Sequence, residues 1–418
     1  MTHLGLVSAS VCAAKGFRTV CYDGDAGLVQ QLADGKLPVE EPGLAEIVRS
    51  NGAAQRFVSS PGELAHCDVV YISTDVPTDQ EGRSDLGSVR SWIDQVIAVL
   101  KPGAALVVLC QVPPGFTRGL SRPQSGPIYY QVETLVFGRA VERALSPERI
   151  IVGCKEPSLS LVPAFATLLE AYACPILLMR YESAELAKIS INFCLIASIG
   201  VANTLAELSE QVGADWSEIV PALKLDRRIG QWAYLQPGLG ISGGNLERDM
   251  RTVLDLAERF GTDTGIIDAW IANSRHRRSW ALDQIRARVL ERIEQPTIAV
   301  WGLAYKENTH STKNSPSLFT IEQMPEARIV VHDPVVAPSA ARHPRVTGAS
   351  DPLAAVIGAD ALMIMTPWPQ YRRVAVGDIA KAMKGRVVID PFAMVDGREA
   401  AAAGLDYHTL GKGRSNPG

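Results

Sequence analysis

Lys188 and Asn192 lie four residues apart in the segment E-L-A-K-I-S-I-N, residues 185–192. Side chains with this spacing share one face of a helix, so an ammonium group and a carboxamide stand side by side. Both groups donate hydrogen bonds, and such donors stabilise negative charge that develops on oxygen. A lysine removed from water at such a place also falls in pKa and can act as a base. The alternative is a solvated lysine beside a capping or core asparagine.

A glycine-rich loop, G-L-G-I-S-G-G at residues 238–244, is the second feature with chemical meaning. Glycine lets the backbone approach a diphosphate or a sugar closely, because it has no side chain. A plain turn is the alternative. Asn245 follows the loop directly, and Asp249 comes one helical turn later. A carboxamide cannot act as a covalent nucleophile, since that role needs a thiol, hydroxyl, amine or carboxylate.

The composition is that of a globular protein, with 47% hydrophobic and 21% charged residues. A chain of 418 residues predicts two or three domains. The net charge of -4 without a lysine-rich block argues against a nucleic-acid partner. No apolar run reaches the roughly 18 residues of a membrane span, so no membrane partner is expected. The seven cysteines are scattered, which predicts reduced thiols in the cytoplasm and no metal site.

Two kinds of sequence pattern, one typical of α/β sheets and one typical of long helices, alternate along the chain and predict three domains. Residues 1–182 alternate short apolar runs with helical patterns, which predicts a parallel α/β sheet. Residues 183–290 are typical of long helices, and residues 291–418 alternate again. We therefore expect an α/β protein with two Rossmann-like doubly wound domains joined by a central all-helical region. The tail, residues 411–418, is expected to be disordered.

Apolar runs locate the expected strands within the two sheets. The predicted strands are Thr19–Tyr22, Val69–Ser73, Ala105–Leu109, Pro127–Tyr130, Ile150–Val152, Thr297–Trp301, Arg328–Val331, Ala361–Met365 and Arg386–Ile389. Long helices are expected at Glu185–Val212 and Arg248–Phe260.

A series of motifs resembles the UDP-glucose/GDP-mannose dehydrogenase family over nearly the whole chain. In order, they are G-K-L-P-V-E-E-P-G-L (35–44), V-P-T (76–78), E-L-A-K-I-S-I-N (185–192), D-R-R-I-G (226–230), the loop with its following N-L-E-R-D (238–249), V-W-G-L-A-Y-K-E-N-T (300–309), V-H-D-P (331–334) and T-P-W (366–368). The resemblance implies an NAD-dependent oxidoreductase that acts on a nucleotide-diphosphate sugar. It also implies a homodimer built on the central helices.

The resemblance places the NAD site in the first domain. Residues 1–9 are similar to the end of a glycine fingerprint, with Gly5 packing the first helix closely on a strand. Asp23 ends the strand at 19–22 and would bind the ribose hydroxyls, which favours NAD over NADP. A capping or turn aspartate is the alternative. The expected cofactor contacts are Leu4, Gly5, Asp23, Thr74, Val76, Pro77 and Lys313.

A fingerprint of this kind follows a strand, and that strand is not among residues 1–418. A Rossmann sheet without its central strand would leave the neighbouring strands unpaired, which is costly. Either the start is wrongly assigned or the strand has been lost, and because of this cost we expect a segment upstream of Met1.

The resemblance also assigns the reacting groups. The expected catalytic residues are Gln111, Glu133, Lys188, Asn192, Asn245 and Asp249. Lys188 and Asn192 would face the reacting sugar carbon, and Asp249 would hold a network of waters. Glu133, in Y-Q-V-E-T-L-V-F-G-R-A, matches the first glutamate of the family's N-P-E-F-L-R-E-G segment. The expected substrate contacts are Arg228, Gly240, Gly243 and Lys306.

Three positions depart from the family pattern. Phe137 stands where the family has the second glutamate of that segment, Gln111 where it has a threonine, and Asn245 where it has the cysteine that forms a thioester. All three bear on the covalent intermediate or on the water that releases it. They predict a single two-electron oxidation of an alcohol to an aldehyde or ketone, in place of the four-electron oxidation to a sugar acid.

Two alternatives stay open at this point. A retained NAD could oxidise the sugar transiently and take part in a redox-neutral epimerisation or carbon–carbon cleavage. The chain could also bind sugar nucleotides without catalysis, although Lys188 and Asp249 argue against a silent protein.

Overall fold

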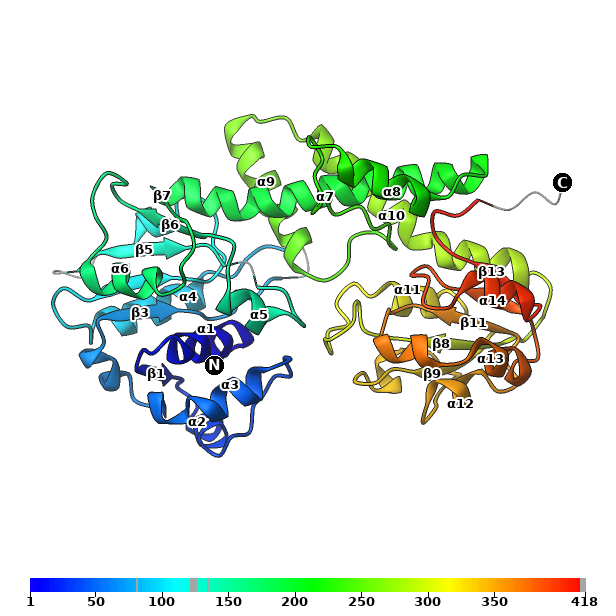
Figure 1. Cartoon of the computed structure of the whole chain (residues 1–418), viewed down its shortest axis with the longest axis horizontal. Coiled ribbons are helices and arrows are strands. Elements are labelled where there is room, and N and C mark those ends of the chain that lie inside the picture. Colours follow the sequence, from blue (N-terminus) through cyan, green and yellow to red (C-terminus); the bar gives the residue numbers. More distant parts are fainter. Residues whose placement is uncertain (80–81, 121–125, 134, 414–418) are drawn as a thin grey trace. The chain divides into compact units, whose positions relative to one another are not determined.

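The computed structural model describes residues 1–79, 82–120, 126–133 and 135–413. They form two compact units, Met1–Ile191 and Asn192–Gly418. Each unit contains an α/β part with a largely parallel sheet, and a helical stretch lies between these parts in the chain (Figure 1). The fold class expected from the sequence is confirmed. The domain boundaries at residues 182 and 290 stay a prediction.

The first unit contains two separate sheets. β1 (Thr19–Tyr22) pairs in parallel with β2 (Gln55–Val58). The second sheet has the order β3-β4-β5-β6-β7. Its strands are β3 (Val69–Ile72), β4 (Ala105–Val108), β5 (Ile128–Gln131), β6 (Ile150–Cys154) and β7 (Ile176–Arg180). Its pairs are parallel except β5 with β6. β4 is buried at every residue, as expected of a strand covered on both faces.

Six α-helices accompany these sheets in the described part of the first unit. They are α1 (His3–Ala14), α2 (Ala26–Ala33), α3 (Leu44–Ser50), α4 (Gly87–Ile97), α5 (Ala140–Leu145) and α6 (Pro163–Glu170). α1 begins after Thr2, whose hydroxyl accepts a hydrogen bond from the Gly5 amide. Leu6, Val7 and Val11 of α1 are fully buried, so this helix is a core element of the unit.

Helix α7 (Tyr181–Val212) has 32 residues and continues from the first unit into the second. By length and composition alone it could cross a membrane, and 33% of its most apolar window is buried. One such helix is weak evidence, because core helices of water-soluble proteins pass the same test. The absence of a membrane partner therefore stays a prediction.

The second unit begins with helices and ends with a sheet. Its helices are α8 (Trp216–Leu225), α9 (Asn245–Phe260), α10 (Gly265–Ile285), α11 (Pro316–Glu322), α12 (Pro352–Val356), α13 (Val376–Ala382) and α14 (Gly397–Ala402). Its strands are β8 (Thr297–Trp301), β9 (Arg328–His332), β10 (Val346–Gly348), β11 (Ala361–Ile364), β12 (Val387–Ile389) and β13 (Asp406–His408). All pairs are parallel, in the order β10-β9-β8-β11-β12-β13. This is the order of a complete doubly wound sheet, whose ligands bind where the order reverses.

The end of the described chain is ordered, and the expected disorder is wrong for residues 411–413. The Gly411 amide donates to Glu210 Oε1 at 2.8 Å, and the Gly411 carbonyl accepts from the Trp216 amide at 2.8 Å. The Gly413 amide donates to the Ala214 carbonyl at 2.9 Å. Residues 414–418 lie outside the described residues.

Asp390, which follows β12, is a fully buried acid in the second unit. Its carboxylate accepts hydrogen bonds from the amides of Phe392 and Val395 and from the Tyr407 hydroxyl. Burial nevertheless raises the pKa of Asp390 to about 6, because desolvation of the charged form outweighs these bonds.

This raised pKa should make the second unit less stable as the pH increases from about 4 to about 6. In that window the unfolded chain has released the Asp390 proton while the folded chain still holds it, so raising the pH favours unfolding. Asp390→Asn should remove this contribution. The measurement is the urea midpoint of both proteins between pH 4 and 7. Parallel midpoint curves for the two proteins would contradict the expectation.

Candidate active site

Asn192 and Asp249 form a buried pair in the second unit, joining α7 to α9. Nδ2 of Asn192 donates to Oδ2 of Asp249 at 2.5 Å, although the residues are 57 positions apart. Asn192 is 8% and Asp249 is 1% exposed. Nε of Arg248 lies 3.8 Å from Oδ1 of Asp249. An ionised carboxylate only accepts hydrogen bonds, so Asp249 fixes which side of the Asn192 amide faces it.

Lys188 lies one helical turn before Asn192 on α7 and is half-buried. Glu185, nearly one turn earlier still, is fully buried in the first unit. Its carboxylate accepts hydrogen bonds from the amides of Gly115 at 2.6 Å and Thr117 at 2.8 Å. Burial raises the pKa of Glu185. Glu185 therefore ties the segment after β4 to the helix that carries Lys188.

The first unit gathers several predicted residues at one edge of its sheet. β3, β4 and β5 are parallel neighbours, so the segments after them leave the same edge. Thr74, Val76 and Pro77 follow β3, while Gln111 follows β4 and Glu133 follows β5. The carboxyl ends of parallel strands are where open α/β sheets bind ligands.

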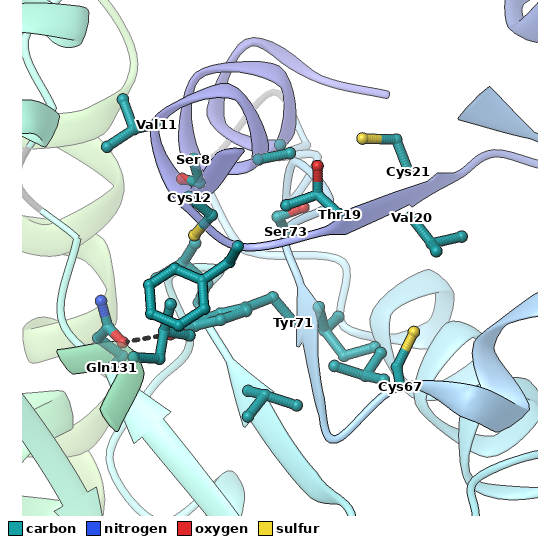
Figure 2. Close-up of a pocket in the computed structure, with 18 of the residues that line it drawn as sticks. Ser8, Val11, Cys12, Thr19, Val20, Cys21, Cys67, Tyr71, Ser73 and Gln131 are labelled. Atoms are coloured by element: carbon teal, nitrogen blue, oxygen red, sulfur yellow. Dashed lines mark hydrogen bonds between the residues drawn. The ribbon is translucent and has the colours of Figure 1, made fainter. Parts of the chain in front are cut away.

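The start of α1 lies beside the residues that follow β1 and β3. Figure 2 shows Ser8 and Cys12 of α1 near β1 and near Ser73, which follows β3. The Thr2 hydroxyl donates to the Ser73 carbonyl at 2.8 Å. A Cβ atom on Gly5 would lie 2.8 Å from Oγ of Ser73, so any larger residue would require the Ser73 side chain to move. Asp23 accepts a hydrogen bond from the Asp25 amide at 2.9 Å and pairs with the Met1 ammonium. Asp23 is thus a turn aspartate whose carboxylate lies at the end of β1.

The glycine-rich loop of the second unit is fixed by close packing. Gly240 has φ 76° and Gly243 has φ 82°, a region that favours glycine. A Cβ atom on Gly240 would lie 2.3 Å from the Ser274 carbonyl oxygen, and one on Gly243 would lie 2.9 Å from the Tyr305 ring. The loop therefore packs on α10 and on the segment after β8, and it is more than a plain turn.

Lys313 and Asn314 cover the other side of this loop. Nζ of Lys313 lies 3.3 Å from the position of a Cβ atom on Gly244, and the Gly243 amide donates to the Lys313 carbonyl at 3.2 Å. Nδ2 of Asn314 donates to the Gly243 carbonyl at 3.2 Å and to Glu247. Burial raises the pKa of Glu247, although Arg278 and Lys313 oppose the shift. Lys313, predicted as a cofactor contact, thus lies against the loop.

Asn245 is the first residue of α9 and is exposed to solvent. It stands next to Gly244 and so close to the Lys313 ammonium. The positive end of the helix dipole and this cation both favour a negative group at this position. The seven cysteines all lie at or before Cys194, so the loop contains no thiol.

The two remaining predicted substrate contacts lie on the surface of the second unit. Nε and Nη2 of Arg228 donate to Asp226 at 3.0 and 2.6 Å, and the Arg228 side chain is 89% exposed. Lys306 is half-buried in the segment after β8, with Nζ 5.8 Å from the centre of the Tyr305 ring. Since Tyr305 contacts Gly243, Lys306 lies near the loop, whereas Arg228 extends into solvent.

Comparison with known proteins identifies this arrangement. Residues 1–173 match the NAD binding domain of the UDP-glucose/GDP-mannose dehydrogenase family, residues 182–275 its central domain and residues 299–397 its UDP binding domain. The chain is 30% identical to a UDP-glucose 6-dehydrogenase of Pseudomonas aeruginosa, over 99% of this chain and 96% of that protein. The chain belongs to the UDP-glucose/GDP-mannose dehydrogenase family.

Other members of the family agree in sequence and in fold. A UDP-glucose 6-dehydrogenase of Bacillus subtilis is 28% identical over 98% of this chain and 91% of its own length. The structure of a UDP-glucose dehydrogenase from Pyrobaculum islandicum superposes with a TM-score of 0.84 at 29% identity, over 95% of this chain and 94% of the other. The chain is accordingly an NAD-dependent nucleotide-sugar dehydrogenase that acts on CH–OH groups.

The start of the first unit fits the family's cofactor. The first amides of a helix have no partner within it, and those of α1 would be available to hold the pyrophosphate. Leu4 lies in this first turn, Gly5 brings the turn against the end of β3, and Asp23 offers a carboxylate for the ribose.

Four residues that hold the site were given no role by sequence reasoning. They are Glu41, Glu185, Glu247 and Asn314. Glu41 accepts hydrogen bonds from the amides of Gly138 and Ala140 at 2.9 and 2.7 Å, and Nε2 of His3 lies 2.9 Å from it. The His3 ring in turn contacts Phe137, with ring centres 4.3 Å apart. Polar residues like these, whose partners lie far away in the sequence, cannot be recognised from a repeating pattern of apolar residues.

Proposed function

We propose that this enzyme removes two electrons from a nucleotide-activated sugar and releases an aldehyde or ketone. Asn245 at the first residue of α9 carries the proposal. A thiol at a helix N-terminus has a lowered pKa and is a strong nucleophile, so this position suits covalent catalysis. The carboxamide of Asn245 cannot form a thioester. Without that intermediate, the route to a sugar acid is interrupted after the first oxidation.

Two further positions support the same reaction. Phe137 has its ring against His3, where a family glutamate would offer a carboxylate for hydrolysis. Gln111 follows β4 and occupies the place of a family threonine. These substitutions would affect the handling of the covalent intermediate and of water. The first oxidation needs neither.

The residues of the first oxidation are present. NAD, when bound, would supply the acceptor for the hydride of the alcohol carbon. In the proposal, Lys188 takes the hydroxyl proton or stabilises the alkoxide, and Asn192 donates a hydrogen bond to the oxygen as its charge develops. An amide nitrogen has two protons, so Asn192 can bind Asp249 with one and the substrate with the other. Asp249 acts through Asn192 as a positioning residue, beside any role in holding water.

The substrate is proposed to be a UDP-sugar. The support is the UDP binding domain match at residues 299–397 and the name UDP-glucose 6-dehydrogenase printed for several relatives. Lys306 and the loop with Gly240 and Gly243 are proposed to hold the sugar and the diphosphate. We expect the reaction to take place in the cytoplasm, without a nucleic acid or a membrane as partner.

Product analysis tests the reaction. With a panel of nucleotide sugars and NAD, we expect at most one NADH per sugar consumed and a product two mass units lighter than the substrate. Absorbance gives the NADH and mass spectrometry gives the product. Asn245→Cys alone should not restore the sugar acid, because Phe137 and Gln111 are unchanged. Two NADH with a carboxylate product would refute the proposal, and turnover without net NADH would favour the redox-neutral alternative.

A homodimer is the expected assembly. Val201, Leu205, Leu208 and Val212 lie on one face of α7 and are 52%, 41%, 55% and 67% exposed. Trp232, in the segment after α8, is 89% exposed. An apolar stripe of this length is typical of an interface and costly in water. A second copy is the proposed partner, as the family resemblance implies.

Light scattering at micromolar concentration should give about twice the 45.0 kDa mass of one chain. Leu208→Lys should shift the mass toward the monomer, because it places a charge in the apolar stripe. Leu159→Lys is the matched control, since Leu159 is 66% exposed in the first unit and lies outside the stripe. A wild-type protein of monomer mass would contradict the dimer.

A further inference from the structure

Two backbone carbonyls of the glycine-rich loop are bound by side chains from two other segments of the second unit. Nη2 of Arg278, on α10, donates to the Ile241 carbonyl at 3.1 Å. Nδ2 of Asn314, in the segment after β8, donates to the Gly243 carbonyl at 3.2 Å. These carbonyls are only two residues apart, so the two side chains together fix the middle of the loop.

Both side chains also meet one carboxylate, that of Glu247 in the first turn of α9. The same Nη2 atom of Arg278 lies 3.7 Å from Oε1 of Glu247, and Nδ2 of Asn314 donates to Oε2. An ionised carboxylate has two oxygens that accept hydrogen bonds, so it can serve both partners at once. Each carboxylate oxygen therefore has its own partner, and each partner also holds one loop carbonyl.

The carboxylate of Glu247 is partly removed from water. The side chains of Glu247 and Arg278 are 33% and 21% exposed. Burial raises the pKa of Glu247 although two cations, Arg278 and Lys313, oppose the shift. Charges in such a place attract each other more strongly than a fully exposed pair does. The contact is therefore able to hold Arg278 in one position on the loop.

The backbone of Asn314 is in a conformation that few residue types adopt. Its φ is 54°, in the left-handed region, where asparagine is found more often than most other residues. Glycine adopts this conformation readily but has no carboxamide. The variant Asn314→Gly thus removes the two side-chain bonds without adding backbone strain.

We propose that Glu247 is a positioning residue, which holds the loop in its binding conformation through Arg278 and Asn314. The inference rests on the proposed role of the loop in holding the sugar and the diphosphate. A carbonyl oxygen has a partial negative charge and repels a diphosphate, and both carbonyls are engaged by donors of the protein itself. A loop that is already ordered also loses less freedom when the ligand binds. Glu247 therefore acts on the affinity for the nucleotide sugar.

The test is isothermal titration calorimetry with UDP-glucose, which gives the Kd and the fraction of binding-competent protein. Glu247→Ala should raise the Kd about tenfold or more, the scale of a lost hydrogen bond to a charged group. Glu247→Gln should give an intermediate Kd, because its single carbonyl oxygen can serve only one of the two partners. A purely structural role would lower the competent fraction and leave the Kd unchanged.

Two further variants test the link between Glu247 and the loop. Asn314→Gly should raise the Kd in a protein that keeps all its charges, so the test stands even if Glu247→Ala folds poorly. The double variant should bind no more than twofold more weakly than Glu247→Ala alone, because both changes break the same link. Asp255→Ala is the matched control. Asp255 pairs with Arg251 on the same helix and is 41% exposed, and its loss should leave the Kd unchanged.

Gly243→Ala separates this inference from the proposed role of the loop. Its added Cβ atom would lie 2.9 Å from the Tyr305 ring, so the loop itself should shift and bind UDP-glucose more weakly. A raised Kd in Gly243→Ala with a wild-type Kd in Glu247→Ala would overturn the inference alone. So would effects of Glu247→Ala and Asn314→Gly that multiply in the double variant. A wild-type Kd in Gly243→Ala, or no binding by the wild type, would refute both proposals.

Discussion

Lys188→Ala is expected to lower kcat by roughly 100-fold or more, the usual scale for one acid–base or electrostatic group. Lys188 lies on α7 between Glu185, which fixes the segment after β4, and Asn192, which is bound to Asp249. If it stabilises the alkoxide or takes the hydroxyl proton, its contribution is greatest in the transition state. The KM for the nucleotide sugar should therefore change much less than kcat.

Two further variants serve as comparisons for the effect of Lys188→Ala on kcat. Ser190→Ala changes an exposed residue of the same helix, whose hydroxyl only bonds back to the Leu186 carbonyl, and should leave kcat unchanged. Lys306→Ala should mainly raise KM, because Lys306 is proposed to hold the substrate. Steady-state kinetics on proteins with unchanged circular dichroism and unchanged mass provides both constants. An unchanged kcat in Lys188→Ala would move the search for the base to Asp249 or Glu133.

Arg277→Ala is expected to lower the free energy of unfolding of the second unit by about 3–5 kcal/mol, the scale for breaking a buried ion pair. Arg277 is 1% exposed. Its Nη1 lies 3.4 Å from Glu207 Oε2, and its Nη2 donates to Glu210 Oε1 at 3.0 Å. Removal of the guanidinium leaves two carboxylates without their shared cation, and Glu210 is itself largely buried.

Arg228→Ala is the matched control for this effect. Arg228 also pairs with an acid, Asp226, but its side chain is 89% exposed. Water screens such a pair, so the urea midpoint should stay at the wild-type value. Urea unfolding, followed by circular dichroism, compares the two variants. Equal midpoints for Arg277→Ala and Arg228→Ala would show that the buried cluster adds no stability.

The predicted strands are apolar runs, although the equally apolar run of β7 (Ile176–Arg180) is missing from the prediction. Thr19–Tyr22 and Thr297–Trp301 agree with β1 and β8 at both ends. β2, with the sequence Q-R-F-V, and the three-residue strands β10 and β13 lie at sheet edges, where polar residues interrupt the pattern. Their formation depends on a neighbouring strand and not on their own sequence.

Site residues could be predicted from the sequence only where they lie in a family motif. The spacing of Lys188 and Asn192 indicates a shared helix face, but their assignment to a reacting carbon came from the family resemblance. The Asn192–Asp249 hydrogen bond joins residues 57 positions apart, and no local pattern encodes such a contact. Glu185 appears in the sequence as an ordinary helical acid. Its burial and its two amide donors become visible only when the segment after β4 is placed against α7.

The contacts of Gly411 and Gly413 bring the last described residues against the end of α7 and the start of α8. Trp216, which is 3% exposed, lies directly against Gly411, and a Cβ atom there would come within 2.8 Å of it. Truncation before Gly411 would uncover this indole and remove a donor from Glu210, whereas additions after residue 413 would leave both in place.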